Sequence, residues 1–166
     1  LFFELDIDII VGLKEVERFR EKLYILTNKQ SIPVWRPSPG YEYYKKLTKE
    51  FNYIAISASG EYDSKWSRKK GAELVLRQME KKTKKENCKV HGLGYTSLEK
   101  LKIIPFHSVD STAWLYGTRG VFLYYFNGYT LIKKNKPKGT KLKTREVAVH
   151  NFREWIKYQQ YAKTNL

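Results

Sequence analysis

Short apolar segments alternate with longer amphipathic segments over most of this chain, and this alternation constrains its fold more than any other feature. The segments that read as strands are residues 2–10, 32–35, 53–57, 89–93 and 107–110. Apolar residues at helical spacing predict helices after Gly12 and at residues 41–51, 65–85 and 97–103. Repeated strand–helix units predict a parallel sheet, because parallel neighbours need a crossover connection.

Polar side chains stand at the carboxyl end of nearly every predicted strand. They are Asp6, Asp8, Arg36, Ser57, His91 and Asp110. Barrel enzymes of the (β/α)8 class place their chemistry at this end of the strands. No glycine-rich dinucleotide fingerprint follows the first strand, which disfavours a nucleotide-cofactor Rossmann domain. The remaining choice is an open sheet or part of a barrel.

A complete (β/α)8 barrel needs about 250 residues, and this chain has 166 and begins at Leu1 inside an apolar run. We therefore expect an α/β fold of the TIM-barrel type that is incomplete. It would hold about the last five or six β/α units of a longer protein. Residues 1–132 are predicted to form this partial barrel domain.

The end of the chain breaks the strand–helix alternation. Asn127-Gly128 is a hairpin signal between the predicted strands 121–126 and 129–133. A basic stretch at residues 134–143 precedes a predicted helix at 145–162. The apolar side of that helix would be Val149, Phe152, Trp155, Ile156 and Tyr161. We expect residues 133–166 to be a basic linker and helix packed on the same domain.

The formal net charge is +15, and residues 133–166 hold ten Lys and Arg against two Asp and Glu. Such a basic end is either a solvated surface or a binding surface for phosphates or anionic lipid. Aromatic residues gather between Trp114 and Tyr129, just before it. Rings and cations together favour nucleic acid over lipid, because unpaired bases stack on rings.

Composition excludes several classes of protein. A chain with 42% hydrophobic and 15% aromatic residues is too apolar to be disordered. No apolar run approaches the roughly 18 residues of a membrane helix, and no secretory signal is visible, so we expect a cytoplasmic location and no membrane partner. Cys88 is the single cysteine, which excludes a disulfide framework and a Cys-based zinc site. The His and carboxylate spacings match no familiar ligand set, so we expect no metal and no cofactor.

Three of the four aspartates, Asp6, Asp8 and Asp110, lie on apolar strands. A carboxylate is costly to bury there unless it is paired or used. They either bond neighbouring amides or share a pocket. His91 precedes Gly92-Leu93-Gly94, where backbone can approach a planar ligand, although a structural histidine explains this pattern equally well.

Several segments, in order, resemble the C-terminal half of tRNA-guanine transglycosylase barrels. They are VHGLGYTSL at residues 90–98, SVDSTAW at 108–114, TRG at 118–120 and the hairpin NGYTLIKKN at 127–135, with YIAISASGE at 53–61 further upstream. Asp110 and Arg119 keep the spacing between the first Asp of the family's "VDxFD" strand and the Arg of its "PTR" loop. The segments are most similar to divergent members from bacteriophages and DNA-modification clusters. The resemblance covers roughly residues 1–136.

The resemblance implies an enzyme that exchanges guanine for a 7-deazaguanine in tRNA or DNA. Asp110 would be the nucleophile. The residues implied to bind the base are Asp6, Asp8, Trp35, Ser57, Gly60, Glu61, His91, Gly92 and Gly94. The residues implied to hold nucleic acid are Trp114, Arg119, Lys133, Lys134 and Lys136. The implied partners are nucleic acid, a small purine-like base and a second copy in a homodimer, in the host cytoplasm if the protein is phage-encoded.

The chain also departs from the family. Ala113 stands where the family usually has its nucleophile, the second Asp of "VDxFD", and Trp35 stands where it has a base-reading Gln. The family's zinc-binding cysteines are absent. One alternative is therefore a catalytically inactive nucleic-acid-binding barrel, and a weaker one is a different barrel hydrolase.

Overall fold

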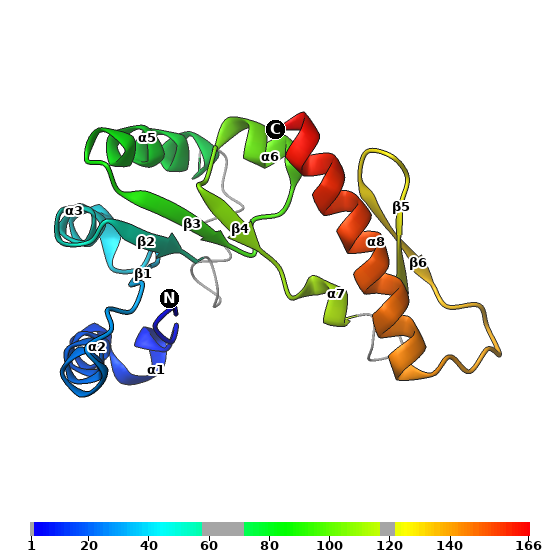
Figure 1. Ribbon diagram of the computed structural model, residues 1–166, viewed down its shortest axis with the longest axis horizontal. Helices are drawn as coiled ribbons and strands as arrows, with labels where there is room; N and C mark the ends of the chain where they lie inside the picture. The colour runs from blue at the N-terminus through cyan, green and yellow to red at the C-terminus, as the bar shows by residue number, and fades with distance from the viewer. Residues whose placement is uncertain (1, 58–71, 117–121) are drawn as a thin grey trace. The chain divides into compact units, whose positions relative to one another are not determined.

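The computed structural model describes residues 2–57, 72–116 and 122–166 (Figure 1). Its elements in chain order are α1 (Asp8–Val11), α2 (Leu13–Thr27), β1 (Val34–Trp35), α3 (Gly40–Glu50), β2 (Tyr53–Ile56), α5 (Ala72–Lys85), β3 (Lys89–Leu93), α6 (Leu98–Ile103), β4 (Ser108–Asp110), α7 (Ala113–Tyr116), β5 (Phe122–Phe126), β6 (Leu131–Asn135) and α8 (Thr144–Asn165). None of the helices in these ranges is both long and apolar enough to cross a lipid bilayer.

The first part of the chain forms a four-stranded parallel sheet with the order β1-β2-β3-β4. An isolated parallel bridge between Phe3 and Ile32 places the N-terminal segment beside β1. Strands that neighbour in sequence are also neighbours in the sheet, as expected for repeated β/α units with crossover helices. The α/β prediction and its parallel sheet are confirmed.

Helices α3 and α5 cover one face of this sheet (Figure 1). The strand residues that point to them include Trp35, Ile54, Ile56 and Val90, all buried. Leu47 from α3 and Leu76 and Met79 from α5 complete this core. In the helix predicted at residues 65–85, helical spacing indicates Leu76 and Met79 as core residues, and both are buried.

The N-terminal apolar run is not one long strand. Only the bridge at Phe3 has strand pairing, and Asp8–Val11 is the short helix α1. Ile9 and Ile10 are exposed. A short apolar run does not distinguish a strand from a helical turn, because it is too short to show either period.

A second compact unit contains residues 96–102 and 111–166, and the sheet unit contains residues 1–95 and 103–110. In the second unit β5 and β6 form an antiparallel hairpin, and α8 packs along β5. The hairpin predicted from Asn127-Gly128 is confirmed. The sequence-based boundary at residue 132 falls inside this second unit.

Helix α8 buries a different side from the predicted one. Val147, Asn151, Glu154 and Tyr158 are buried, whereas Val149, Phe152 and Ile156 are exposed. Asn151 Oδ1 accepts the Tyr124 N–H at 2.8 Å and Glu154 Oε2 accepts the Phe126 N–H at 2.7 Å. These amides lie on the edge of β5 away from β6 and need acceptors when a helix covers them. The side of α8 that faces β5 is therefore set by the hydrogen bonds to the β5 amides and not by the spacing of its apolar residues.

Candidate active site

The sheet face opposite α3 and α5 carries polar groups, and we call it the polar face. Side chains alternate along a strand, so Val34 and Arg36 share this face, as do Ala55 and Ser57. The register pairs Ala55 with His91 and His91 with Ser108, so the side chains of His91 and Ser108 lie on the same face as Ala55. An apolar base of Ile32, Val34 and Ala55 supports it, with Phe3, Tyr53 and Leu93 packed around them.

Asp6 and Asp8 meet at the carboxyl end of β1, on the guanidinium of Arg36. Arg36 Nη1 lies 2.7 Å from Asp6 Oδ1 and 3.1 Å from Asp8 Oδ1. Ser57, at the end of β2, donates a hydrogen bond of 2.7 Å to Asp6 Oδ2. Two carboxylates share the one guanidinium of the buried Arg36, so this cluster keeps an excess of negative charge and is an ordered acceptor surface at the strand ends.

Asp110 and His91 form a second polar group, on β4 and β3. Asp110 Oδ1 lies 3.6 Å from His91 Nε2 and accepts the Gly94 N–H at 3.0 Å. Gly94 has φ +75°, a conformation that favours glycine, in the turn that aims its amide at Asp110. The Asp110 side chain is 51% exposed, so an oriented carboxylate stands at the sheet edge with access to a ligand.

The two groups lie at the same end of the sheet. Leu93 pairs with Asp110, and extending the β2–β3 register by one residue sets Ser57 level with Leu93. Strands β2 and β4 are two strands apart, which separates their backbones by about 10 Å. The structure therefore brings together Asp6, Asp8, Ser57, His91, Gly94 and Asp110, six of the residues expected from the sequence.

Burial controls the charge of His91. The histidine is 6% exposed, and this burial lowers its pKa below the usual 6.5, against the opposing influence of the Asp110 carboxylate. The Phe3 ring packs on the imidazole with centroids 4.6 Å apart. Burial therefore favours the neutral imidazole over the imidazolium in the free protein.

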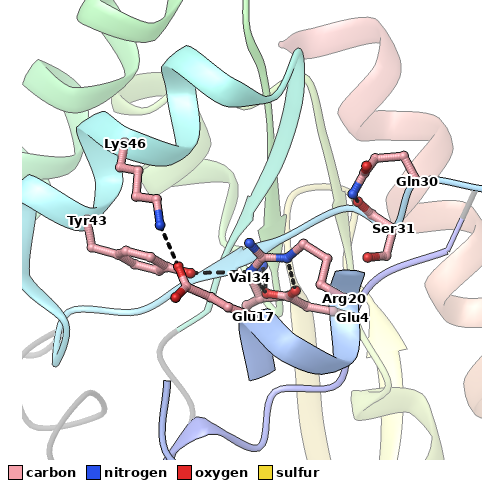
Figure 2. A network of polar contacts seen from close by, with 8 residues as sticks. All are labelled: Glu4, Glu17, Arg20, Gln30, Ser31, Val34, Tyr43 and Lys46. Atoms are coloured by element: carbon pink, nitrogen blue, oxygen red, sulfur yellow. Dashed lines mark hydrogen bonds and ion pairs between the residues drawn. The ribbon is translucent and has the colours of Figure 1, made fainter. Parts of the chain in front are cut away.

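A buried ion pair fixes the N-terminal segment that carries Phe3 and Asp6 (Figure 2). The Arg20 guanidinium donates to Glu4 at 2.7 and 3.0 Å and to the Tyr43 hydroxyl at 3.2 Å. Glu4 Oε1 also accepts the Val34 N–H at 2.6 Å. One carboxylate thus ties the segment to α2 and β1, and through Arg20 to α3, and holds one side of the site in place.

Two expected site residues lie on the other face of the sheet. Trp35 is buried in the core beneath α3, and its indole N–H donates to the Gly40 carbonyl at 2.8 Å. A Cβ at Gly92 would lie 2.8 Å from the Phe106 ring, so the close approach at this glycine is made by the protein's own side chain. The structure favours a packing role for both residues.

The remaining expected residues are not part of this cluster. Gly60, Glu61 and Arg119 lie outside the described residues. Trp114 packs on Phe152 of α8, with ring centroids 5.3 Å apart. Lys133, Lys134 and Lys136 are exposed on and just after β6.

Three residues of the polar face are absent from the predicted site, although the sequence already places Arg36 among the polar side chains at the strand ends. Arg36 pairs with both aspartates, and Ser108 and Tyr53 form hydrogen bonds next to His91. Period-two alternation could have found Ser108, which stands two residues before Asp110, and Arg36, which stands two residues after Val34. Nothing in the sequence indicates that the Tyr53 hydroxyl reaches across to β4.

Comparisons with known proteins leave the site to be interpreted from its own chemistry. No family model, curated protein or solved structure matches this chain. Over the residues that the structure describes, no three His, Cys, Asp or Glu side chains are grouped as metal ligands. The site is thus an oriented carboxylate, a buried neutral imidazole and an ordered carboxylate–guanidinium cluster.

Proposed function

We propose that the protein is a nucleic-acid base-exchange enzyme of the tRNA-guanine transglycosylase type. Asp110 would attack C1′ of a nucleotide in tRNA or DNA, guanine would leave, and a 7-deazaguanine would take its place. The observation that carries the proposal is the half-exposed Asp110 carboxylate, oriented by the Gly94 amide beside a buried His91. An accessible, oriented carboxylate is what nucleophilic catalysis at an anomeric carbon requires.

The sheet topology supports a barrel-like scaffold for this chemistry. A doubly wound sheet reverses its strand order and carries helices on both faces. Here the order is sequential and α3 and α5 cover the same face. A barrel has this arrangement, with its inner face lined by alternating side chains and its active site at the carboxyl ends of the strands.

The Asp6–Asp8–Arg36 cluster supports recognition of a purine edge. Carboxylate oxygens accept hydrogen bonds from the N–H groups of guanine and 7-deazaguanine. Ser57, which donates to Asp6, lies two strand spacings from Asp110, and Arg36 lies three, so a base between them could face the aspartates while its sugar faces the nucleophile. The target base must leave its stack to reach such a site.

The hairpin supplies cations for the nucleic-acid backbone. Lys133 Nζ lies 5.0 Å from the Phe122 ring centroid and Lys134 Nζ lies 5.1 Å from that of Tyr125. Consecutive residues of a strand point to opposite faces, so both faces of the hairpin carry an ammonium group. Beside α8 lies a hollow of about 550 Å³ whose lining carries three cations, Arg145, Arg153 and Lys157, and two carboxylates, Glu146 and Glu154.

A nucleic-acid-binding protein without catalysis is the second candidate. It is favoured by Ala113, which cannot replace the nucleophile that the resembled family usually has at this position. The two candidates share the hairpin lysines and differ at Asp110. Base exchange requires a functional nucleophile, whereas binding of nucleic acid does not.

A guanine-exchange assay separates them. The protein is incubated with tRNA and with duplex and single-stranded DNA that carry labelled guanine, with and without added 7-deazaguanine. Release or exchange of label from one of these substrates supports the enzyme. Tight binding without release of label from any of them would support the second candidate and overturn the first.

A further inference from the structure

The two nitrogens of His91 have different surroundings. Nδ1 lies 2.7 Å from Ser108 Oγ, and Ser108 Oγ lies 2.6 Å from the Tyr53 hydroxyl. Nε2 is buried and has no hydrogen-bond partner within the described part of the chain. Its distance of 3.6 Å to Asp110 Oδ1 is too long for a hydrogen bond. Nδ1 is therefore held by Ser108, whereas Nε2 faces the Asp110 carboxylate across a distance longer than a normal hydrogen bond.

The anchor tolerates both charge states of the ring. A hydroxyl group donates and accepts, so Ser108 and Tyr53 can accept from Nδ1–H or donate to its lone pair. The ring can lose or gain a proton at Nε2 without leaving Nδ1 unsatisfied. The titratable groups around it are Asp110 from β4 and Tyr53 from β2, with His107 against the far side of the Tyr53 ring.

We propose that His91 transfers protons at Nε2 to the leaving base and from the entering base, and that Ser108 and Tyr53 position it. This inference rests on the proposed base exchange. An unpartnered nitrogen on a buried imidazole costs stability unless a ligand uses it. A base held between Asp110 and the Asp6–Asp8–Arg36 cluster would supply that partner.

The proposed proton transfers balance over one cycle. In the first half, an Asp110 oxygen bonds to C1′, the C1′–N bond breaks, and the departing base keeps the electron pair and takes the Nε2 proton of protonated His91. In the second half, neutral Nε2 removes the N–H proton of the incoming base. The nitrogen electron pair then bonds to C1′, and the C1′–O electron pair returns to Asp110. His91 ends protonated and Asp110 ionised, as at the start.

The pH dependence of the first half follows from these roles. Adduct formation requires protonated His91, and burial lowers the pKa of this group below 6.5. The single-turnover rate should therefore rise as pH falls through that pKa. His91→Gln should lose this dependence and about 10²- to 10⁴-fold in rate, the usual contribution of general acid–base catalysis. Ser108→Ala should retain the dependence with a shifted midpoint.

The test measures base release in single turnover from pH 5 to 8 for the wild-type protein and three variants. His107→Gln is the matched control, because His107 is an exposed histidine beside the same strand, and it should follow the wild-type profile. Should His91→Gln fail to fold, Ser108→Ala and a ¹⁵N NMR titration of His91 test the same claim. A wild-type profile in His91→Gln would overturn the role of His91, and an unshifted midpoint in Ser108→Ala would overturn its positioning by Ser108; neither result bears on the proposed function. Absence of base release from wild-type protein at every pH would instead overturn the proposed function.

Discussion

The sheet unit and the second compact unit, which we call the hairpin–helix unit, differ in how their polar side chains are placed. In the sheet unit Arg20, Arg36 and His91 are buried and meet carboxylates at fixed distances. In the hairpin–helix unit the lysines of β6 and α8 are exposed, and the buried Asn151 and Glu154 accept hydrogen bonds from backbone amides. Buried charges that are held in place suit chemistry on a small target, and exposed cations suit a long polyanion. Under the proposed function, the first unit would carry the reaction and the second would bind the nucleic-acid backbone.

The largest expected effect breaks the buried ion pair of the sheet unit. Arg20 and Glu4 have side chains that are 8% and 7% exposed, so Arg20→Met leaves a buried carboxylate unpaired. We expect a loss of about 3–5 kcal/mol in the free energy of unfolding, measured by urea denaturation. Arg18→Met is the control on the same helix, because the Arg18 side chain is 63% exposed and its pair with Glu15 is screened by solvent, so its loss should change the free energy of unfolding little. Equal losses of unfolding free energy in the two variants would show that the buried pair of Arg20 and Glu4 in Figure 2 does not hold the N-terminal segment.

A smaller effect tests how α8 is attached to the hairpin. Asn151→Ala removes the acceptor of the Tyr124 N–H and leaves a buried donor unsatisfied. The expected cost is about 1–3 kcal/mol, with faster hydrogen exchange at the Tyr124 amide. The exposed Gln159 of the same helix provides the control Gln159→Ala. Unchanged exchange at Tyr124 would show that the rotation of α8 has another cause.

The hairpin lysines should affect binding and leave stability nearly unchanged. If Lys133, Lys134 and Lys136 contact phosphates, replacing all three with Ala should flatten the dependence of log affinity on log salt. The expected change in slope is about 0.7 to 0.9 for each lost contact. Fluorescence anisotropy with a labelled oligonucleotide at several salt concentrations measures it. An unchanged slope would make these lysines an ordinary solvated surface.

Periodicity in the sequence predicted the elements better than it predicted their contacts. Residues 53–57 and 89–93 were predicted as strands and 41–51 as a helix, because apolar spacing distinguishes these elements when they pack on one core. The side of α8 that carries Asn151 and Glu154 was not predicted to be buried, because the Tyr124 N–H lacks an acceptor only once the hairpin has formed. The helical turn at Asp8–Val11 was missed because a short apolar run fits either structure.

The site was predictable where it depends on strand ends and was not where it depends on sheet register. Asp110 and His91 were expected near one another because the carboxyl ends of parallel strands share an edge. Trp35 was expected beside them, but alternation from Val34 turns it toward α3. The Tyr53–Ser108–His91 chain needs the pairing of three strands, which no single segment encodes.

Covalent trapping tests the central assignment, the nucleophile Asp110, most directly. Wild-type protein and Asp110→Asn are mixed with oligonucleotide substrate without an incoming base, denatured rapidly and analysed by intact mass. The account predicts a protein–nucleic-acid adduct in the wild type and none in Asp110→Asn, with nearly equal binding affinities, because an amide has a similar shape but is a far poorer nucleophile. An adduct in Asp110→Asn at the wild-type rate would place the nucleophile elsewhere. A collapse of affinity together with activity would make Asp110 a structural carboxylate and contradict the account.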